Sequence, residues 1–283
     1  MKTKNILKLI FLFCFISQVS ATYAQNLNRA FDFKVGDEYV KNTKVISTGV
    51  VERGEQNVSV NTESQIKKSI KVTDSTSNGY GFKITIEEMD NKIESLNNVL
   101  HFNSNKPVDP SSKIEKALRY MLDKPVELKT DKYGIVLSTE DPSKLLANDT
   151  LLAFAGIQPE FFERGDLFSL VGDFQYDPSL KKGYSWTDSL VIDEQKMVTE
   201  YLIEEVTKES TVIKLTTSSF GRLINSNINA TYIVDNKSGV ILEKIIYTIS
   251  TGFRVSNKVL FAISRSTSIV ETITKRTPTL TSK

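Results

Sequence analysis

The fold that we expect for this chain rests on one segment, Tyr80-Gly81-Phe82-Lys83-Ile84-Thr85-Ile86-Glu87. Large apolar residues alternate strictly with small or polar ones along it. A period of two places one row of side chains on a core and the other in water, as in an antiparallel sheet with one solvated face. Val, Ile and Thr dominate the other apolar runs, and β-branched residues favour a pleated, half-buried surface. The sequence therefore predicts a large antiparallel sheet.

Two similar openings divide the chain, Lys34-Val35-Gly36-Asp37-Glu38-Tyr39 and Lys181-Lys182-Gly183-Tyr184-Ser185-Trp186. Each combines a lysine, a turn glycine and an aromatic residue that starts a strand. Each part also carries two strands joined by a tight acidic turn, at 131–134 and at 235–239. There an aspartate bonds its own turn backbone and a glycine takes positive φ. We interpret the two parts as an internal duplication.

The second part ends in further strands, over 244–250 and 255–274, which we expect to be joined near Thr251-Gly252. Between the two parts the apolar spacing changes to that of helices. A first helix is expected between Asp109 and Pro125, a second from Ser143 to Gly156, and a third from Pro159 onward. Amphipathic helices must bury their apolar stripe, and the sheet offers the only large apolar surface.

The predicted fold class is therefore α+β and β-rich. Large antiparallel curved sheets come from two similar halves, and a helical insert packs on one face. The expected divisions are a signal peptide at 1–24, a first β-rich half at 25–108, the helical insert at 109–173 with a hairpin at 126–137, a second β-rich half at 174–277, and a tail at 278–283.

The first 24 residues have the pattern of a secretory signal peptide. Three lysines precede an apolar run from Leu9 to Ile16, and small residues follow up to Ala24. The run is shorter than the roughly 20 residues that span a bilayer, so we expect no retained transmembrane segment. We expect cleavage after Ala24, with cleavage after Ala21 as the alternative.

Removal of the signal changes the composition of the mature chain. The single cysteine, Cys14, is lost, so no disulfide or thiolate chemistry remains. Three of the 36 basic residues are lost too, which leaves 33 against 34 acidic ones. A nearly neutral chain without a basic run does not favour nucleic acid as a partner. The 259 residues that remain of 283 are enough for one large domain or two small ones.

The sequence offers few groups for catalysis. His101 is the only histidine, and zinc sites and Ser-His-Asp triads need partners that do not accompany it. Acidic residues pair at Glu87-Glu88, at Glu204-Glu205, and at the two turns through Asp131 and Asp235. Adjacent glutamates in a strand should point to opposite faces, and the aspartates are turn formers. We therefore predict no enzyme, no catalytic residue, no metal site and no cofactor.

Aromatic residues gather in the predicted helical insert, at Phe154, Phe161, Phe162 and Phe168. Helices resting on a curved sheet either seal a core or roof a pocket for a hydrophobic ligand. Both interpretations stay open, and under the second these four residues are the candidate ligand-binding set.

The Lys-x-Gly-x-x-Tyr/Trp openings, the Asp-x-x-Gly turns and the signal ending in Tyr23-Ala24-Gln25 resemble a family of exported proteins of Bacteroidetes-type bacteria, classed as a domain of unknown function. The resemblance covers most of the mature chain. It implies the periplasm or cell surface of a Gram-negative bacterium, with no assigned activity or site residues. The plan of a sheet with helices is also similar to periplasmic lipoprotein carriers, which hold acyl chains under helices.

Three functions are compatible with these observations. The leading hypothesis is an exported non-enzymatic protein that binds a lipid, another hydrophobic ligand or an envelope protein between sheet and helices. One alternative is a structural or assembly module that acts through exposed sheet edges. The other is a hydrolase that acts through Glu88, Asp131 and Asp235.

Overall fold

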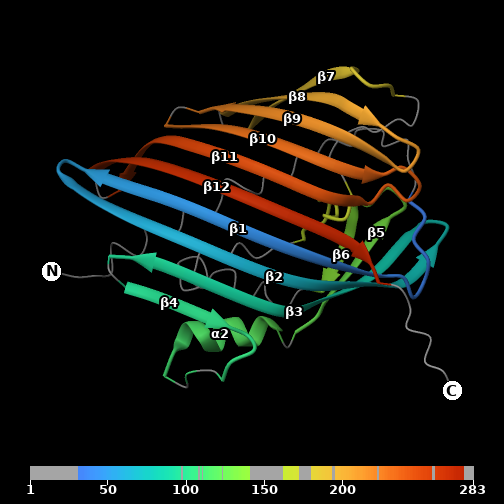
Figure 1. The fold of residues 1–283 in the computed structure, drawn as a ribbon, viewed down its shortest axis with the longest axis horizontal. Helices are drawn as coiled ribbons and strands as arrows, with labels where there is room; N and C mark the ends of the chain where they lie inside the picture. The colour runs from blue at the N-terminus through green and yellow to red at the C-terminus, as the bar shows by residue number, and fades with distance from the viewer. Residues whose placement is uncertain are drawn as a thin grey trace.

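The computed structural model describes residues 31–96, 98–107, 109, 111–122, 124–140, 162–171, 180–192, 195–221, 223–256 and 259–276. Within them, antiparallel strands form a 12-stranded sheet in the order β6-β5-β3-β2-β1-β12-β11-β10-β9-β8-β7, and β4 pairs with the second half of β3 (Figure 1). The first part of the chain forms β1 (Glu38–Arg53), β2 (Gln56–Thr76), β3 (Gly79–Ser95), β4 (Asn98–Asn103), β5 (Val126–Asp131) and β6 (Val136–Glu140). The second part forms β7 (Ser185–Ile192), β8 (Gln195–Val206), β9 (Ser210–Phe220), β10 (Ile224–Asp235), β11 (Ile241–Ser256) and β12 (Val259–Lys275).

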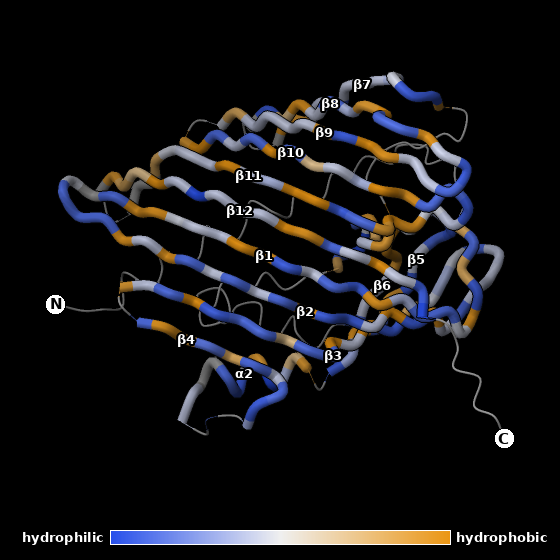
Figure 2. Tube along the Cα trace, viewed as in Figure 1, coloured by the Kyte–Doolittle hydropathy of each residue, from blue (hydrophilic) through white to orange (hydrophobic). Residues whose placement is uncertain are grey.

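We refer to the two faces of the sheet as inner and outer. The inner face carries Tyr39, Ile70 and Phe82, which are at most 5% exposed, and all three buried clusters of the described residues lie on it. Hydrophobic and hydrophilic residues alternate along the long strands (Figure 2). The row from Tyr80 to Ile86 faces inward and Lys83 faces outward, so the predicted strand and its two faces are confirmed.

The predicted α+β class, with a helical insert packed on one face, is wrong. Within 109–173 the described residues contain one helix, α2 (Lys113–Leu122), and the β5–β6 hairpin. Residues 162–171, expected in the third helix, are not helical. Their backbone forms isolated bridges instead, Leu167 with Ile135 just before β6 and Val171 with Val240 just before β11. The second predicted helix and Phe161 lie outside the described residues.

Helix α2 confirms the first of the predicted helices, and its sequence explains where it begins. The Ser112 hydroxyl accepts the backbone N–H of Glu115 (3.2 Å), and the Glu115 carboxylate accepts the N–H of Asp109 (2.8 Å). Such capping satisfies backbone donors that the first helical turn leaves unpaired. On its apolar side, Leu118 and Met121 pack with Met89, Ile93 and Phe102 on the inner face of β3 and β4. The helix therefore covers only this margin of the sheet (Figure 1).

The two openings form the same structure. Gly36 and Gly183 have φ of +91° and +85°. The Gly36 N–H donates to the carbonyl oxygen of Val72 on β2 (3.0 Å), and the Gly183 N–H donates to that of Ile203 on β8 (2.8 Å). The pairing of β2 with β3 shifts register just after Val72, and that of β8 with β9 just after Ile203. Along the sheet, the strands of each part follow in descending order, β6-β5-β3-β2-β1 and then β12-β11-β10-β9-β8-β7. The duplication itself stays a prediction.

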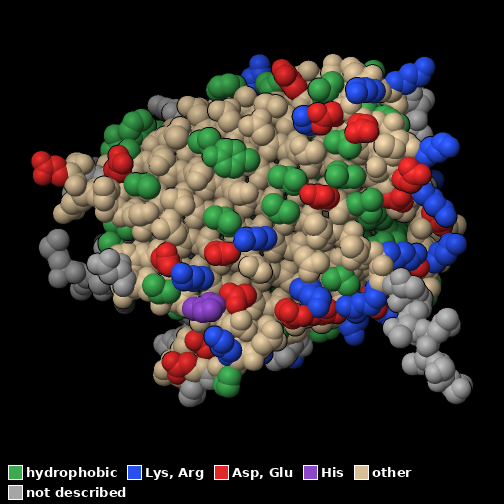
Figure 3. Space-filling view, in the orientation of Figure 1, with side chains coloured by type: hydrophobic (Ala, Val, Ile, Leu, Met, Phe, Trp, Pro, Cys, Tyr) green, Lys and Arg blue, Asp and Glu red, His purple; other side chains and the backbone are tan. Residues whose placement is uncertain are grey.

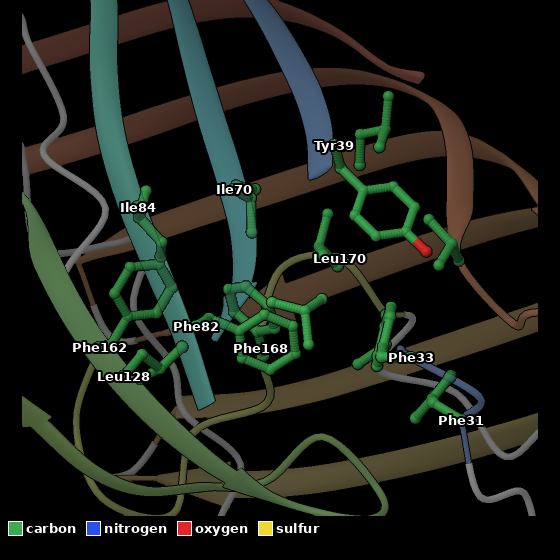
Figure 4. Close-up of a cluster of buried hydrophobic side chains, with 14 of the residues drawn as sticks. Phe31, Phe33, Tyr39, Ile70, Phe82, Ile84, Leu128, Phe162, Phe168 and Leu170 are labelled. Atoms are coloured by element: carbon green, nitrogen blue, oxygen red, sulfur yellow. The ribbon is translucent and has the colours of Figure 1, made fainter. Parts of the chain in front are cut away.

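The largest buried cluster closes one end of the sheet. The segment 162–171 ties the β5–β6 hairpin to the start of β11, so that β5 and β6 lie behind the ends of the long strands (Figure 1). The buried members of this cluster are Phe31, Phe33, Tyr39, Ile70, Val72, Phe82, Ile84, Leu128, Val136, Phe162, Phe168, Leu170, Val171, Val240 and Ile273 (Figure 4). Burying each large side chain contributes about 1.5–3 kcal/mol, so this cluster stabilises the curved arrangement of the strands at this end of the sheet.

The turn expected near Thr251-Gly252 is wrong, because both residues lie inside β11. Gly252 pairs with Ile224 on β10 and Ile263 on β12. A Cβ atom on Gly252 would lie 2.1 Å from the carbonyl oxygen of Leu223, so the glycine marks a close backbone approach and not a turn.

We expect Gly252→Ala to lower the free energy of unfolding by about 1–3 kcal/mol, because backbone must move to admit the methyl group. Gly49 is the matched control, since a Cβ there would meet its nearest atom at 3.9 Å. Gly49→Ala should leave stability unchanged or slightly raised. Urea denaturation of both variants checks this, and equal stability of the two would contradict it.

Tyr39 should make the fold sensitive to alkali. Burial, followed by the charge of Asp37, raises the pKa of its phenol from 10.0 to about 12. Below pH 10 the phenol is neutral in both states; between pH 10 and 12 only the unfolded chain ionises, so stability is lost as pH rises. We expect a loss of about 1–2 kcal/mol over this range. Denaturant unfolding of Tyr39→Phe should show a shallower decline, and parallel curves for the two proteins would refute the assignment.

Candidate functional site

The predicted ligand-binding phenylalanines fall into two groups. Phe154 and Phe161 lie outside the described residues. Phe162 and Phe168 lie together in the largest buried cluster, 3% and 0% exposed, with ring centroids 5.7 Å apart. Phe168 also packs against Phe82, at 4.6 Å between centroids (Figure 4). This position gives Phe162 and Phe168 a packing role, and a role in ligand binding stays a prediction.

We expect Phe168→Ala to lower the free energy of unfolding by about 3–5 kcal/mol, because it leaves a cavity among close-packed aromatic rings. Phe220→Ala makes the same change at a side chain that is 59% exposed, and it should cost less than about 1 kcal/mol. Guanidinium denaturation measures both. A Phe168 variant as stable as the Phe220 variant would exclude the packing role.

The expectation that Glu87 and Glu88 point to opposite faces is wrong. The pairing of β2 with β3 shifts register between Lys67 and Lys68, which is a bulge that turns both glutamates to the outer face. The Lys67 ammonium lies 2.7 Å from Glu88 and 3.5 Å from Glu87. The hydrogen bond to Glu88, with its charge, raises the pKa of Lys67. Arg276 also binds Glu87 at 3.0 Å, so these carboxylates are held in ion pairs.

Asp131, Asp235 and His101 also have hydrogen-bonding partners within the chain. Asp131 accepts the N–H groups of Tyr133 (2.8 Å) and Ile135 (2.9 Å) in its own turn, and Asp235 accepts the N–H of Ser238. His101 Nε2 lies 3.0 Å from Asp90 Oδ1 on the outer face. Among the residues that the structure describes, no three His, Cys, Asp or Glu side chains gather closely enough to hold a metal ion. The carboxylates of the hydrolase hypothesis do not converge on one another.

The outer face carries an open polar groove of about 400 Å³ across β12, β1, β2 and β3. Charged side chains in its walls already have partners, because Lys67 forms an ion pair with Glu88 and Asp90 lies within hydrogen-bonding distance of His101. Charged side chains gather along the lower and right margins of this face (Figure 3). These margins have the character of a solvated sheet surface.

The inner face, by contrast, carries polar side chains within its apolar rows. Residues that are directly opposite each other on neighbouring strands form lines across the sheet, and three neighbouring lines show the pattern. The first consists of Ile273, Lys41, Lys68 and Ile86; the second of Lys244, Glu271, Thr43, Ile66 and Met89; and the third of Ile246, Ile269, Val45, Ser64, Asn91 and Phe102. The first two lines hold cations, and the third is apolar until Ser64. Hence a charged region and an apolar strip adjoin on one surface.

Lys41 and Lys68 are directly opposite each other in the first line. The Lys41 side chain is 3% exposed, and its ammonium lies 3.0 Å from Glu271, which is 12% exposed. Thr43 donates a further hydrogen bond to Glu271 (3.2 Å). Lys244 pairs across strands with Glu271, and its ammonium lies 5.2 Å from the centre of the Tyr232 ring. Among the described residues of these lines, Lys41, Lys68 and Lys244 are the basic side chains and Glu271 is the acidic one.

Hydroxyl groups form a belt next to these lines. Ser47 and Thr267 are hydrogen-bonded across β1 and β12 (3.1 Å), and Ser226 and Ser250 across β10 and β11 (2.7 Å). Arg265 donates to Ser47 at 2.8 Å. The four hydroxyl residues are at most 9% exposed, so the belt is buried and internally bonded.

Sequence reasoning missed these inner-face polar residues, although a signal was present. Lys68 lies between Ile66 and Ile70 in the apolar row of β2, and Asn91 lies between Met89 and Ile93 in that of β3. A polar residue inside an otherwise apolar row of a strand points toward a core, where burial needs a partner.

Comparison with known proteins gives no family. No family model and no curated protein match the chain. Among solved structures, OccK7 of Pseudomonas aeruginosa is 6% identical, with a TM-score of 0.22 over 85% of this chain and 100% of that one. An outer membrane channel of Pseudomonas putida F1 is 6% identical, with a TM-score of 0.21 over 87% and 98%. The KdgM porin is 8% identical, with a TM-score of 0.16 over 84% and 98%. At such low TM-scores these likenesses carry no argument.

Among the helices of the described residues, none has the length and apolar character needed to cross a bilayer.

Proposed function

We propose that this chain is an exported, non-enzymatic binding protein of the cell envelope that holds an anionic amphiphile against the inner face of its sheet. The ligand would combine an acyl chain with a carboxylate or phosphate group. The observation that carries the proposal is the pair of lysines, Lys41 and Lys68, opposite each other on the inner face.

The lysine pair places two ammonium groups opposite each other on the inner face. Like charges directly opposite each other destabilise a sheet, and a buried ion pair such as Lys41–Glu271 adds little stability in return for its desolvation. Apolar residues at these positions would pack at lower cost. An anionic group beside Lys41 and Lys68 would make charge-assisted hydrogen bonds in a region of low dielectric, where they are strong.

The adjoining strip suits an acyl chain. Val45, Ile246 and Ile269 lie side by side on β1, β11 and β12, and Ile66 lies next to the lysine pair. All four are only partly buried, so apolar surface is left for a ligand to cover. Each methylene that an acyl chain buries contributes about 0.8 kcal/mol, which gives useful affinity from a short contact.

Palmitate and hexadecanol, added to the delipidated protein, test the proposal because they differ in charge and share the chain. We expect Lys68→Gln to weaken palmitate binding about 10-fold and to leave hexadecanol unchanged, because it removes one charge-assisted hydrogen bond. Isothermal titration calorimetry measures both affinities.

Lys71→Gln is the matched control, since Lys71 lies on the same strand and pairs with Glu38 on the outer face. It should leave both ligands unaffected. The proposal fails if palmitate does not bind the wild-type protein, or if the two lysine variants behave alike.

The assembly hypothesis keeps a physical basis in β7. Within the described residues this strand pairs only with β8 and forms the margin of the sheet, and Val191 on it is 67% exposed. An edge without proline or lysine can accept a further strand. That function stays a prediction.

A further inference from the structure

Ser64 and Asn91 are a polar pair without hydrogen bonds. They lie directly opposite each other on β2 and β3, on the inner face. Ser64 is 2% exposed and Asn91 is 0% exposed. The Ser64 hydroxyl and both amide atoms of Asn91 have no hydrogen-bond partner. Buried polar groups in folded proteins are nearly always paired, so this cluster calls for an explanation.

The surroundings of the pair are apolar. Met89 and Ile93 flank Asn91 along β3, and Phe102 faces it on β4. Leu118 and Met121 of α2 pack on the same cluster. A leucine at position 91 would fill this space without leaving polar atoms unpaired, so the asparagine costs the empty protein stability. A partner from outside the chain would remove that cost.

We infer that Ser64 and Asn91 form a hydrogen-bonding subsite for an amide group within the acyl ligand. The inference rests on the proposed function, because it assigns a further feature to the same ligand. The Asn91 amide offers a donor and an acceptor, and the Ser64 hydroxyl offers both as well. A secondary amide, with one N–H and one C=O, complements this set, whereas a plain acyl chain leaves it unpaired.

The position of the subsite sets the spacing within the ligand. Ser64 and Lys68 are four residues apart on one strand and on one face, which is about 13 Å along the sheet. An amide about ten bonds along an extended chain from a carboxylate spans a similar distance. N-hexanoyl-ω-aminoundecanoic acid has this spacing, and stearic acid is its all-carbon analogue of equal length.

The experiment compares these two acids on the delipidated, full-length mature protein by isothermal titration calorimetry. We expect the wild-type protein to bind the amide acid at least as tightly as stearic acid. An apolar wall without a subsite would bind it at least about 10-fold more weakly, because the amide would be buried unpaired.

Asn91→Leu should weaken binding of the amide acid about 10-fold, leave stearic acid within about 2-fold, and raise the melting temperature by about 2–4 °C. Asn42→Leu is the matched control on the outer face, where Asn42 pairs with Lys67, and it should change neither affinity. Ser64→Ala should show the same selective loss, to a smaller degree, and it carries the test if Asn91→Leu does not fold.

The outcomes separate the two proposals. If the wild-type protein binds neither acid, the proposed function fails. If it binds stearic acid and rejects the amide acid, or if the position 91 and 64 variants leave the ratio of the two affinities unchanged, the subsite alone is refuted.

Discussion

The rest of the structure depends on the backbone ladder between β1 and β12. It runs from Tyr39 opposite Lys275 to Glu52 opposite Ala262, and it joins the first strand of the chain's described part to the last. The strands of the first part of the chain lie on one side of this ladder and those of the second part on the other, so the ladder makes the inner face continuous. The Lys41–Glu271 ion pair and the Arg265–Ser47 hydrogen bond both cross this ladder. The candidate site therefore lies where β1 pairs with β12.

The inner face combines two tendencies that oppose each other. Its closed end is packed with aromatic and aliphatic side chains such as Phe82 and Phe168, whose burial stabilises the curl of the sheet. Farther along the same strands, lysines and the Ser64–Asn91 pair occupy positions where apolar residues would stabilise more. Proteins accept such costs at sites that meet a ligand, because the binding free energy compensates them. This contrast is the main support for ligand binding on the inner face.

Much of the sheet could be predicted from the sequence, because alternation along residues 80–87 and the turn chemistry of Asp131 and Asp235 are local signals. The non-helical structure of residues 162–171 could not be predicted, because the spacing of Phe162 and Phe168 fits a helix. The segment instead bridges to residues of two hairpins that are distant in the sequence. Gly252 was misread because a close backbone approach and a turn both require glycine. The site was missed for a related reason: Lys68 and Asn91 break an apolar row, and only the three-dimensional register shows them facing one surface.

The place of β12 has a consequence for biogenesis. This strand is in the middle of the sheet and is the last strand of the described chain, so β1 and β11 each keep one hydrogen-bonding edge unpaired until β12 joins them. Long unpaired edges recruit other chains, and contacts between segments distant in sequence form slowly. A partly folded chain in which β12 has not yet paired therefore exposes two strand edges to association with other chains.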